Sequence, residues 1–236
     1  MKTAHPITRR NCLALGACAA SALLVPPARA SVTPDVVAEL FTSQGCSSCP
    51  PANANLIELS KRDDVLALSF AVTYWDRLGW KDIFGREDYT ARQYAYEPGL
   101  GERGPFTPQM VINGRKSLVG NRLGEVEAGI AAVAPLVGPA VSLINGRLEI
   151  AAAEASSPAD VWLVRYDPNV VEVPIARGEN TGRTLPHTHV VHDLTNLGQW
   201  DGQALSLTVA EAEAGLNTAV LVQLRNGGAI LSAVTD

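Results

Sequence analysis

The chain has 236 residues, 47% of them hydrophobic, and carries a formal net charge of −5 at pH 7. It is long enough to bury its own hydrophobic cores, in one or two domains. Its acidic balance argues against nucleic acid and against anionic membrane surfaces as partners.

Residues 1–30 have the pattern of an export signal. A positive head with Arg9 and Arg10 precedes an uncharged run at residues 11–25, and small residues end the segment. The apolar run is too short to span a membrane. The arginine pair resembles a twin-arginine signal, and an ordinary signal or a lipid anchor on Cys18 are the alternatives. We therefore expect a periplasmic or secreted protein that does not insert in the membrane once the signal is removed.

Removal of this segment changes the composition of the chain. The 19 basic residues fall to 15 against 24 acidic ones, so the formal charge becomes −9. Two of the four cysteines leave as well, and Cys46 and Cys49 remain. A single disulfide that closes a ring of four residues cannot stabilise the fold of the rest of the chain, so a fold that depends on disulfides is excluded.

Residues 31–136 alternate between strand and helix patterns. Continuous apolar runs predict buried strands, and apolar residues at helical spacing predict helices. Asn113-Gly114 predicts a hairpin turn. The expected elements are a strand at 35–41, a helix at 51–62, a strand at 65–72, inserted helical turns rich in aromatic residues at 74–104, a strand at 107–114 with a hairpin partner, and a helix at 121–134. This order requires a sheet with parallel and antiparallel strands, covered by helices.

The composition changes after a stretch rich in proline and glycine near residue 137. Short strand-like runs separated by turn residues then continue to the C-terminus. The runs are VSLI, RLEIAA, VWLVRY, VVEVPIA, HTHVVHDL, ALSLTV, AVLVQL and AILSAV. Regular short strands without a helical stretch predict an all-β, sandwich-like domain at residues 137–236.

The two remaining cysteines form a C-x-x-C motif between the first strand and the first helix. This arrangement is typical of thioredoxin-like redox proteins, so residues 31–136 are predicted to form a thioredoxin-like α/β domain. The N–H groups at a helix N-terminus stabilise a nearby thiolate. Cys46 would then be the attacking thiol, and Cys49 would resolve the mixed disulfide.

Two prolines limit where the helix can begin. Pro50 and Pro51 have no N–H, which is tolerated only in the first three helical positions. The N-cap must therefore be Ser48 or Cys49. Cys46 then lies two or three residues before the cap, so we expect its pKa to be lowered moderately.

Two further residues extend the predicted site. A cis-proline opens the strand that faces the cysteines in thioredoxin-like folds, and Pro108 stands at that place, so we predict a cis Thr107–Pro108 bond. Glu39 lies in an otherwise apolar strand. If it is buried, Glu39 could shuttle protons to Cys49, and the alternatives are a solvated edge or a structural ion pair.

Several blocks of the chain together resemble one family. They are VVAELFTSQGCSSCPPA, YWDRLGWKD, TARQYAY, TPQMVING, VWLVRYDP and RGENTGRTLPH. In this order they are similar to the secreted family called domain of unknown function 1223, which implies a thioredoxin-like N-terminal half and a β-rich C-terminal half. The chain departs from the family where Ala71 and Thr73 replace a histidine and an acid, and where Asn53 replaces an aspartate. No acid–base or metal role is therefore expected at those positions.

Metal binding is the first alternative function. Two thiolates could hold Cu(I) or half of a zinc site, although a closed zinc site needs four ligands. The histidines outside the signal are His187, His189 and His192. On one strand the first two share a face and the third points away, so we expect exposed strand histidines that do not converge.

The second alternative is a binding module with a structural disulfide. The block RGENTGRTLPH is too polar for an ordinary turn, and it predicts either a specific role or a network that pins two domains together. Its polar residues include Arg177, Glu179, Asn180 and Arg183. The aromatic insert is similarly open to two interpretations. A groove over the cysteines, or an ordinary core, could be formed by Trp75, Asp76, Trp80 and Tyr96.

The function predicted from the sequence is thiol–disulfide exchange on a protein substrate in the cell envelope. Cys46 attacks, Cys49 resolves and Pro108 shapes the substrate groove. The sequence contains neither a P-loop nor a dinucleotide-binding fingerprint, so no cofactor is expected.

Overall fold

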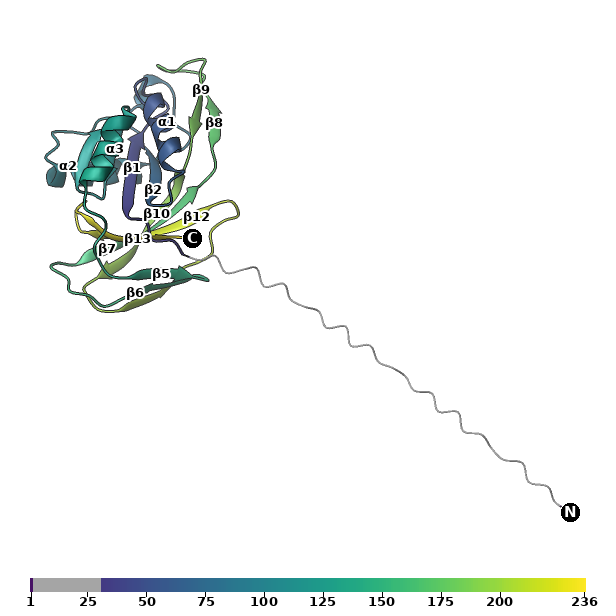
Figure 1. The fold of residues 1–236 in the computed structure, drawn as a ribbon. Coiled ribbons are helices and arrows are strands. Elements are labelled where there is room, and N and C mark those ends of the chain that lie inside the picture. Colours follow the sequence, from purple (N-terminus) through teal and green to yellow (C-terminus); the bar gives the residue numbers. More distant parts are fainter. Residues whose placement is uncertain (2–30) are drawn as a thin grey trace.

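The structure is a computed structural model that describes Met1 and residues 31–236 (Figure 1). Apart from Met1, the predicted export signal lies outside the described residues. Within residues 31–236 none of the helices is both long and apolar enough to cross a membrane.

One mixed sheet of eight strands runs through most of the chain (Figure 1). The strands are β1 Val36–Thr42, β2 Val65–Ala71, β3 Gln109–Ile112, β4 Lys116–Val119, β7 Ala159–Asp167, β10 Val190–Trp200, β12 Asn217–Leu224 and β13 Ile230–Thr235. Their order across the sheet is β13-β12-β7-β10-β2-β1-β3-β4. β1 pairs in parallel with β2 and antiparallel with β3, as the sequence pattern requires.

Helices cover both faces of the N-terminal part of this sheet. They are α1 Pro50–Leu59, α2 Glu87–Leu100 and α3 Leu123–Ala132, with a short 3-10 turn, η1 Asp76–Leu78, before α2. Successive side chains of a strand point to opposite faces. Ala38 and Leu40 of β1 therefore pack with α1 and α3, whereas Val37 and Phe41 pack on the other face with α2.

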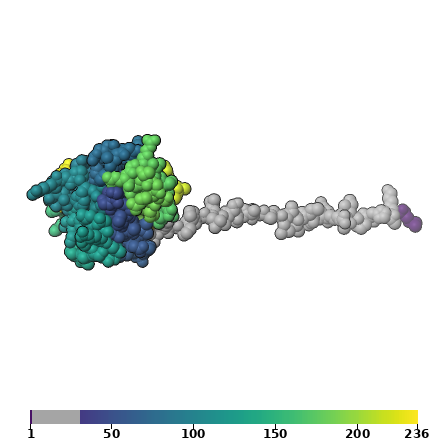
Figure 2. Space-filling view, turned by 90° about the horizontal axis from the view of Figure 1, so that it is seen from above, coloured from purple at the N-terminus to yellow at the C-terminus, as the bar shows by residue number. Residues whose placement is uncertain are grey.

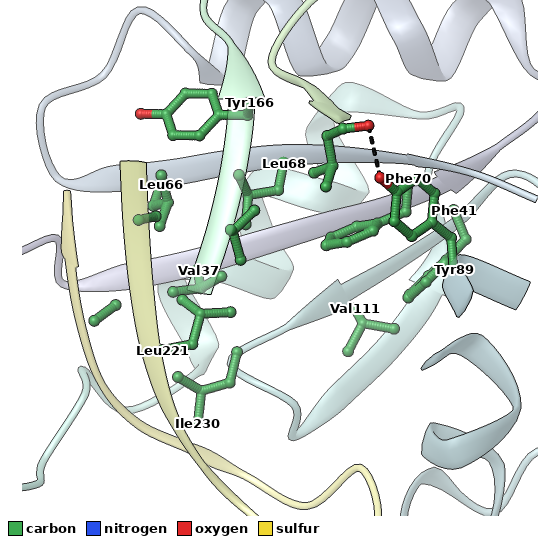
Figure 3. Packing of buried hydrophobic residues seen from close by; sticks show 14 of the residues in the cluster. Val37, Phe41, Leu66, Leu68, Phe70, Tyr89, Val111, Tyr166, Leu221 and Ile230 are labelled. Carbon is green, nitrogen blue, oxygen red and sulfur yellow. Dashed lines mark hydrogen bonds between the residues drawn. The ribbon is translucent and has the colours of Figure 1, made fainter. Parts of the chain in front are cut away.

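The largest hydrophobic core joins the two halves of the chain. It contains Val37 and Phe70 from the first half and Tyr166 and Leu221 from the second (Figure 3). Tyr89 of α2 crosses the same core, and its hydroxyl donates a hydrogen bond to the carbonyl of Val191 at 3.0 Å (Figure 3). The two halves are thus packed against each other through buried apolar surface.

Two smaller sheets complete the fold. β5 Val141–Ile144, β6 Arg147–Ile150 and β11 Leu205–Thr208 form a three-stranded sheet in the order β11-β6-β5. Its apolar side chains, such as Leu148, pack with Val161, Val220 and Trp200 in a second core. The hairpin of β8 Val171–Pro174 and β9 Thr184–His187 leaves the main sheet and contacts α1 (Figure 1).

The predicted fold class is wrong. The chain is not a thioredoxin-like α/β domain followed by an all-β sandwich, but a mostly-β mixed sheet with three α-helices in the described residues. The sheet continues past β2, because the Ser69 amide donates to the His189 carbonyl at 2.9 Å and Val190 pairs in parallel with Ser69. A short apolar strand has the same sequence pattern whichever half it pairs with, so this long-range pairing was not visible in the sequence.

The predictions of individual strands and turns agree with the structure better than the predicted fold class does. The hairpin turn between β3 and β4 is at Asn113 and Gly114, which have φ values of 50° and 62°. The run predicted as a single strand at residues 187–194 is interrupted by His189, whose φ of 47° is left-handed. β9 and β10 are therefore separate strands in different sheets.

Candidate functional site

The two cysteines lie at the start of α1, directly after β1. Pro50 and Pro51 open this helix, and Cys49 is its N-cap, which is one of the two positions predicted from the missing N–H groups. Cys46 lies three residues before the cap. The two cysteines form a disulfide, with their Cα atoms 5.4 Å apart.

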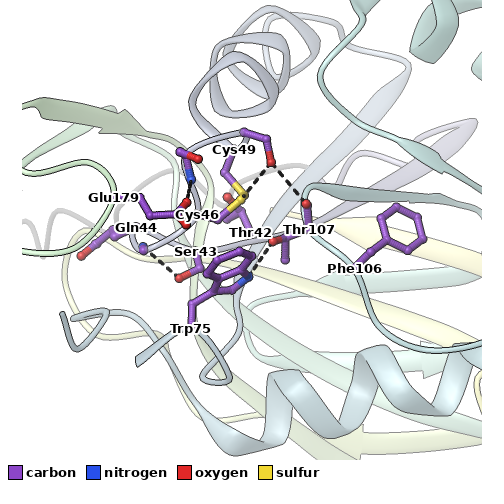
Figure 4. The surroundings of a disulfide bond; sticks show 12 residues. Thr42, Ser43, Gln44, Cys46, Cys49, Trp75, Phe106, Thr107 and Glu179 are labelled. Atoms are coloured by element: carbon purple, nitrogen blue, oxygen red, sulfur yellow. Dashed lines mark hydrogen bonds between the residues drawn. A yellow bond between two sulfur atoms is a disulfide. The ribbon is translucent and has the colours of Figure 1, made fainter. Parts of the chain in front are cut away.

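Both cysteines are fully buried, with 0% of either residue exposed. The Ser48 hydroxyl lies 3.3 Å from Sγ of Cys46 and donates to the Thr107 carbonyl at 3.5 Å. Figure 4 shows the disulfide enclosed by side chains from several segments, with Trp75 close to it. The disulfide thus has no open approach from solvent in this conformation.

The third predicted site residue is close to the cysteines. Pro108 follows Thr107 through a cis peptide bond, as predicted. Thr107 is held in place by the Trp75 indole, whose N–H donates to the Thr107 hydroxyl at 2.8 Å (Figure 4). Since Ser48, between the two cysteines, also bonds to Thr107, the structure brings Cys46, Cys49 and Pro108 into one site.

The aromatic insert contacts the cysteine loop, which we define as residues 43–49. The Trp80 indole N–H donates to the side-chain oxygen of Gln44 at 2.8 Å. A Cβ atom at Gly45 would lie 3.1 Å from the Cβ of Trp75, so only a glycine fits there without displacing this tryptophan. The two tryptophans therefore contact the cysteine loop. Both also pack against hydrophobic clusters, so each of the two interpretations of the insert holds in part.

Asp82 is a buried acid that holds the cysteine loop from the same insert. It is 2% exposed, and its carboxylate accepts the backbone N–H of Gln44 at 2.7 Å and that of Phe84 at 2.9 Å. Asp76, predicted as part of the roof, accepts the Asp82 N–H at 3.1 Å and does not reach the cysteines itself. Burial raises the pKa of Asp82 to about 6, although the two amide hydrogen bonds oppose this shift.

Asp82 is expected to make stability depend on pH between about 4 and 6. The folded protein holds a proton there that the unfolded chain has already released, so this contribution to stability falls as pH rises. The free energy of unfolding of the wild type minus that of Asp82→Asn should therefore decrease by about 2 kcal/mol from pH 4 to pH 6.5. Urea denaturation of both proteins measures it. A difference that is constant or that grows with pH would contradict the raised pKa.

A segment of the C-terminal half lies on the cysteine loop. We call residues 177–183, between β8 and β9, the strap. The Glu179 carboxylate accepts the backbone N–H of Ser47 at 3.0 Å (Figure 4). The fully buried Asn180 side chain donates to the carbonyls of Gln44 and Cys46, both at 2.9 Å. The dense polar block, predicted to have a specific role or to pin two domains together, thus binds the backbone of the cysteine loop.

Glu39 does not reach the cysteines. It is fully buried on the face of β1 opposite to α1, where it pairs with Arg92 at 2.7 Å and accepts a short hydrogen bond from the Tyr96 hydroxyl. Burial and the Glu39 charge hold the pKa of Tyr96 well above 10. Among the alternatives for Glu39, the structural ion pair is therefore the one observed, and Tyr96 belongs to this pair and not to a roof over the cysteines.

A buried histidine lies behind the cysteine helix. The Thr42 hydroxyl donates to the Asn53 oxygen at 2.9 Å, so the Asn53 amide nitrogen is left to donate to Nδ1 of His187 at 3.3 Å. The neutral ring then carries its proton on Nε2, which has no hydrogen-bond partner within residues 31–236. Burial lowers the pKa of His187 to about 4, so the ring is neutral at pH 7.

The histidines do not converge on the cysteines as a metal site. His187 is buried, His189 is half-buried with Nδ1 2.7 Å from the Ala67 carbonyl oxygen, and only His192 is exposed, so the expectation of exposed strand histidines holds for one of the three. No group of three or more His, Cys, Asp or Glu side chains that could hold a metal occurs in the part of the chain that the structure describes.

The positions at which the chain departs from the resembled family have structural partners. Asn53 connects Thr42 to His187, as described above. Thr73 donates its amide to the Thr90 hydroxyl at 3.0 Å, and their hydroxyls also lie 3.0 Å apart. Ala71 is buried at the end of β2.

Asp82 was not predicted from the sequence as a residue of the site. Its local signature was present, because the Asp82 carboxylate accepts the amide two residues ahead, as an Asx turn does. That signature indicates a turn and says nothing about a partner 38 residues away. The contact between Asp82 and Gln44 depends on packing that no local pattern records.

Solved structures with a similar fold exist for two proteins. The first is a crystal structure of a protein from Agrobacterium tumefaciens, with 31% sequence identity, a TM-score of 0.71, and an alignment that covers 86% of this chain and 93% of that one. The second is HBP35 of Porphyromonas gingivalis, with 14% identity, a TM-score of 0.54, and coverage of 88% and 76%. At 14% identity the second shows similarity of fold alone. Comparison with curated proteins gives no match.

The family comparison agrees with the blocks quoted from the sequence. A family model described as a protein of unknown function, DUF1223, matches residues 37–223. This range begins in β1, includes the cysteine loop and the strap, and ends in β12. The matched range covers most of the chain, and the chain therefore belongs to the DUF1223 family.

Proposed function

We propose that this protein exchanges thiols and disulfides through Cys46 and Cys49. The observation that carries the proposal is the position of the disulfide, at the N-terminus of α1 and beside the Thr107–Pro108 bond. Helix N–H groups with partial positive charge favour a thiolate at that place. A disulfide ring of four residues restricts the unfolded chain only slightly, so it adds little to the stability of the fold.

The proposed reaction has two steps. In the reduced protein the Cys46 thiolate attacks a substrate disulfide, and a mixed disulfide forms while one substrate thiolate leaves and takes a proton. The Cys49 thiolate then attacks Sγ of Cys46, and the second substrate thiolate leaves. The substrate gains two electrons, and the cysteine pair becomes a disulfide. The reverse sequence oxidises a substrate dithiol.

The proposed substrate is a protein thiol or disulfide in the cell envelope. The predicted export signal supports this location, because disulfides form and persist in oxidising compartments outside the cytosol. The predicted charge of the exported chain, −9, also fits a protein partner better than a nucleic acid.

A structural disulfide is the second candidate, and one observation favours it. Both cysteines are fully buried, whereas a reacting disulfide must be reached by another sulfur atom. In that case the C-terminal half of the chain would carry the function.

The reduction potential of the Cys46–Cys49 pair separates these two functions. The purified protein is equilibrated in dithiothreitol and glutathione buffers, alkylated and analysed by mass, with the peptide that contains both cysteines assigned separately from other thiols. A midpoint between about −120 and −270 mV, the range of known exchange proteins, is expected. A pair that stays oxidised below about −300 mV would be a structural disulfide and would contradict the proposal.

A further inference from the structure

We propose that the strap is a removable cover that must detach from the cysteine loop before the disulfide can react. This inference rests on the proposed function of Cys46 and Cys49. The Cys46–Cys49 disulfide lies at a helix N-terminus, a position that favours reaction, yet it is completely buried, and these two observations conflict unless a segment moves. A disulfide with 0% exposure cannot meet another sulfur atom unless part of its surroundings moves.

The strap is attached to the loop by polar contacts of a kind that can open. Glu179 accepts the Ser47 N–H, and Asn180 donates to the carbonyls of Gln44 and Cys46. Water can replace each of these partners once the segments separate, so each bond contributes little net free energy. By contrast, the core that joins the two halves is apolar, and it stays closed when such a contact opens.

The shape of the strap allows it to move as one piece. The Ile175 amide donates to the Arg183 carbonyl and the Gly182 amide donates to the Ile175 carbonyl, both at 2.8 Å, which closes the strap into a loop at the end of the β8–β9 hairpin. Gly178 and Gly182 have φ values of 82° and 79°, a conformation that glycine adopts without strain. In Figure 2 the green surface that includes this hairpin lies beside the purple surface that includes the cysteine loop.

Other segments hold the cysteine loop, but they are part of the main core. Trp75 and Asp82 come from the insert between β2 and α2, and Asp82 is buried. Asn180 is also buried, and the small cluster of its hairpin, Val173, Ile175 and Leu185, packs against Trp80 and Phe84 of the insert. Residues 177–183 supply no side chain to this cluster or to the other hydrophobic clusters of the described residues, so the strap can detach while its hairpin stays packed.

Reduction by dithiothreitol tests the proposal on the whole protein. One reductant thiolate attacks Sγ of Cys46, the Cys49 thiolate leaves and is protonated, and the second reductant thiol closes its own ring, so both cysteines end as thiols. The variant Asn180→Asp is nearly isosteric but cannot donate to the two carbonyls. We expect it to be reduced about ten-fold faster than the wild type, because opening precedes attack.

Two controls separate opening from general destabilisation. Glu172→Gln changes an exposed carboxylate on β8 of the same hairpin and is expected to leave the reduction rate within two-fold of the wild type. Amide hydrogen exchange, read by mass, is expected to accelerate in Asn180→Asp at residues 43–49 and not in β1 or β12.

Three results would overturn the proposal. One is a reduction rate of Asn180→Asp within two-fold of the wild type. The second is faster hydrogen exchange in every strand, and the third is an equal acceleration in Glu172→Gln. Failure of the proposed function is a separate outcome, because a potential below about −300 mV in the wild type leaves the comparison of reduction rates intact.

Discussion

Cys46→Ser is expected to abolish disulfide exchange with protein and glutathione substrates. The substituted hydroxyl cannot form a mixed disulfide, and Cys49, the N-cap of α1, has the resolving role in the proposed reaction. The loss should be at least a thousand-fold, because a nucleophile is removed and not merely weakened. Insulin reduction, followed by turbidity, measures it.

Cys49→Ser tests the second step of the proposed reaction, in which Cys49 resolves the mixed disulfide. Cys46 can still attack, but nothing resolves the product, so a mixed disulfide between Cys46 and glutathione should accumulate and be visible by mass. Ser47→Ala is the matched control, since Ser47 lies between the two cysteines and donates to Glu179 a backbone N–H that the substitution keeps. Equal activity in Cys46→Ser and the wild type would exclude the proposed function.

Glu39→Gln is expected to destabilise the protein by about 3–5 kcal/mol, because it removes one partner of a buried ion pair. Arg92 is 7% exposed, and its guanidinium lies 5.4–5.6 Å from the ring centres of Phe70, Tyr96 and Trp162. The neutral amide cannot balance this charge. Urea denaturation at pH 7 measures the change.

The double variant Glu39→Gln with Arg92→Met tests what causes the loss of stability in Glu39→Gln. If the cost comes from an uncompensated charge, removing the charge should recover part of the lost stability, as replacement of buried ion pairs by apolar residues often does. Glu58→Gln is the matched control, since Glu58 pairs with Lys61 on the exposed surface of α1, and it should change stability by no more than about 0.5 kcal/mol. A loss for Glu39→Gln as small as that of the control would contradict the prediction.

The strap explains why both halves of the chain belong to one site. Asn180 lies 134 residues after Cys46 in the sequence, and its side chain donates to the Cys46 carbonyl. If the strap detaches as proposed, its opening controls access to the disulfide without any change in Cys46 or Cys49 themselves.

Local physical chemistry made several parts of this protein predictable from its sequence. The missing N–H groups of Pro50 and Pro51 placed the N-cap at Cys49 or its neighbour, and the structure has Cys49 there. The Asn113-Gly114 pair determined the β3–β4 turn, because both residues tolerate positive φ. In each case the physical cause lies within a few residues of its effect.

Tertiary structure alone decided which of these elements meet. The sequence does not record that β10 pairs with β2, that Glu39 faces α2, or that Asn180 lies on the cysteine loop. These contacts join residues 50 or more positions apart, and the same polar or apolar pattern would fit several partners. The packing of the whole chain selects one of them, because buried polar groups must find hydrogen-bond partners and apolar faces must be covered together.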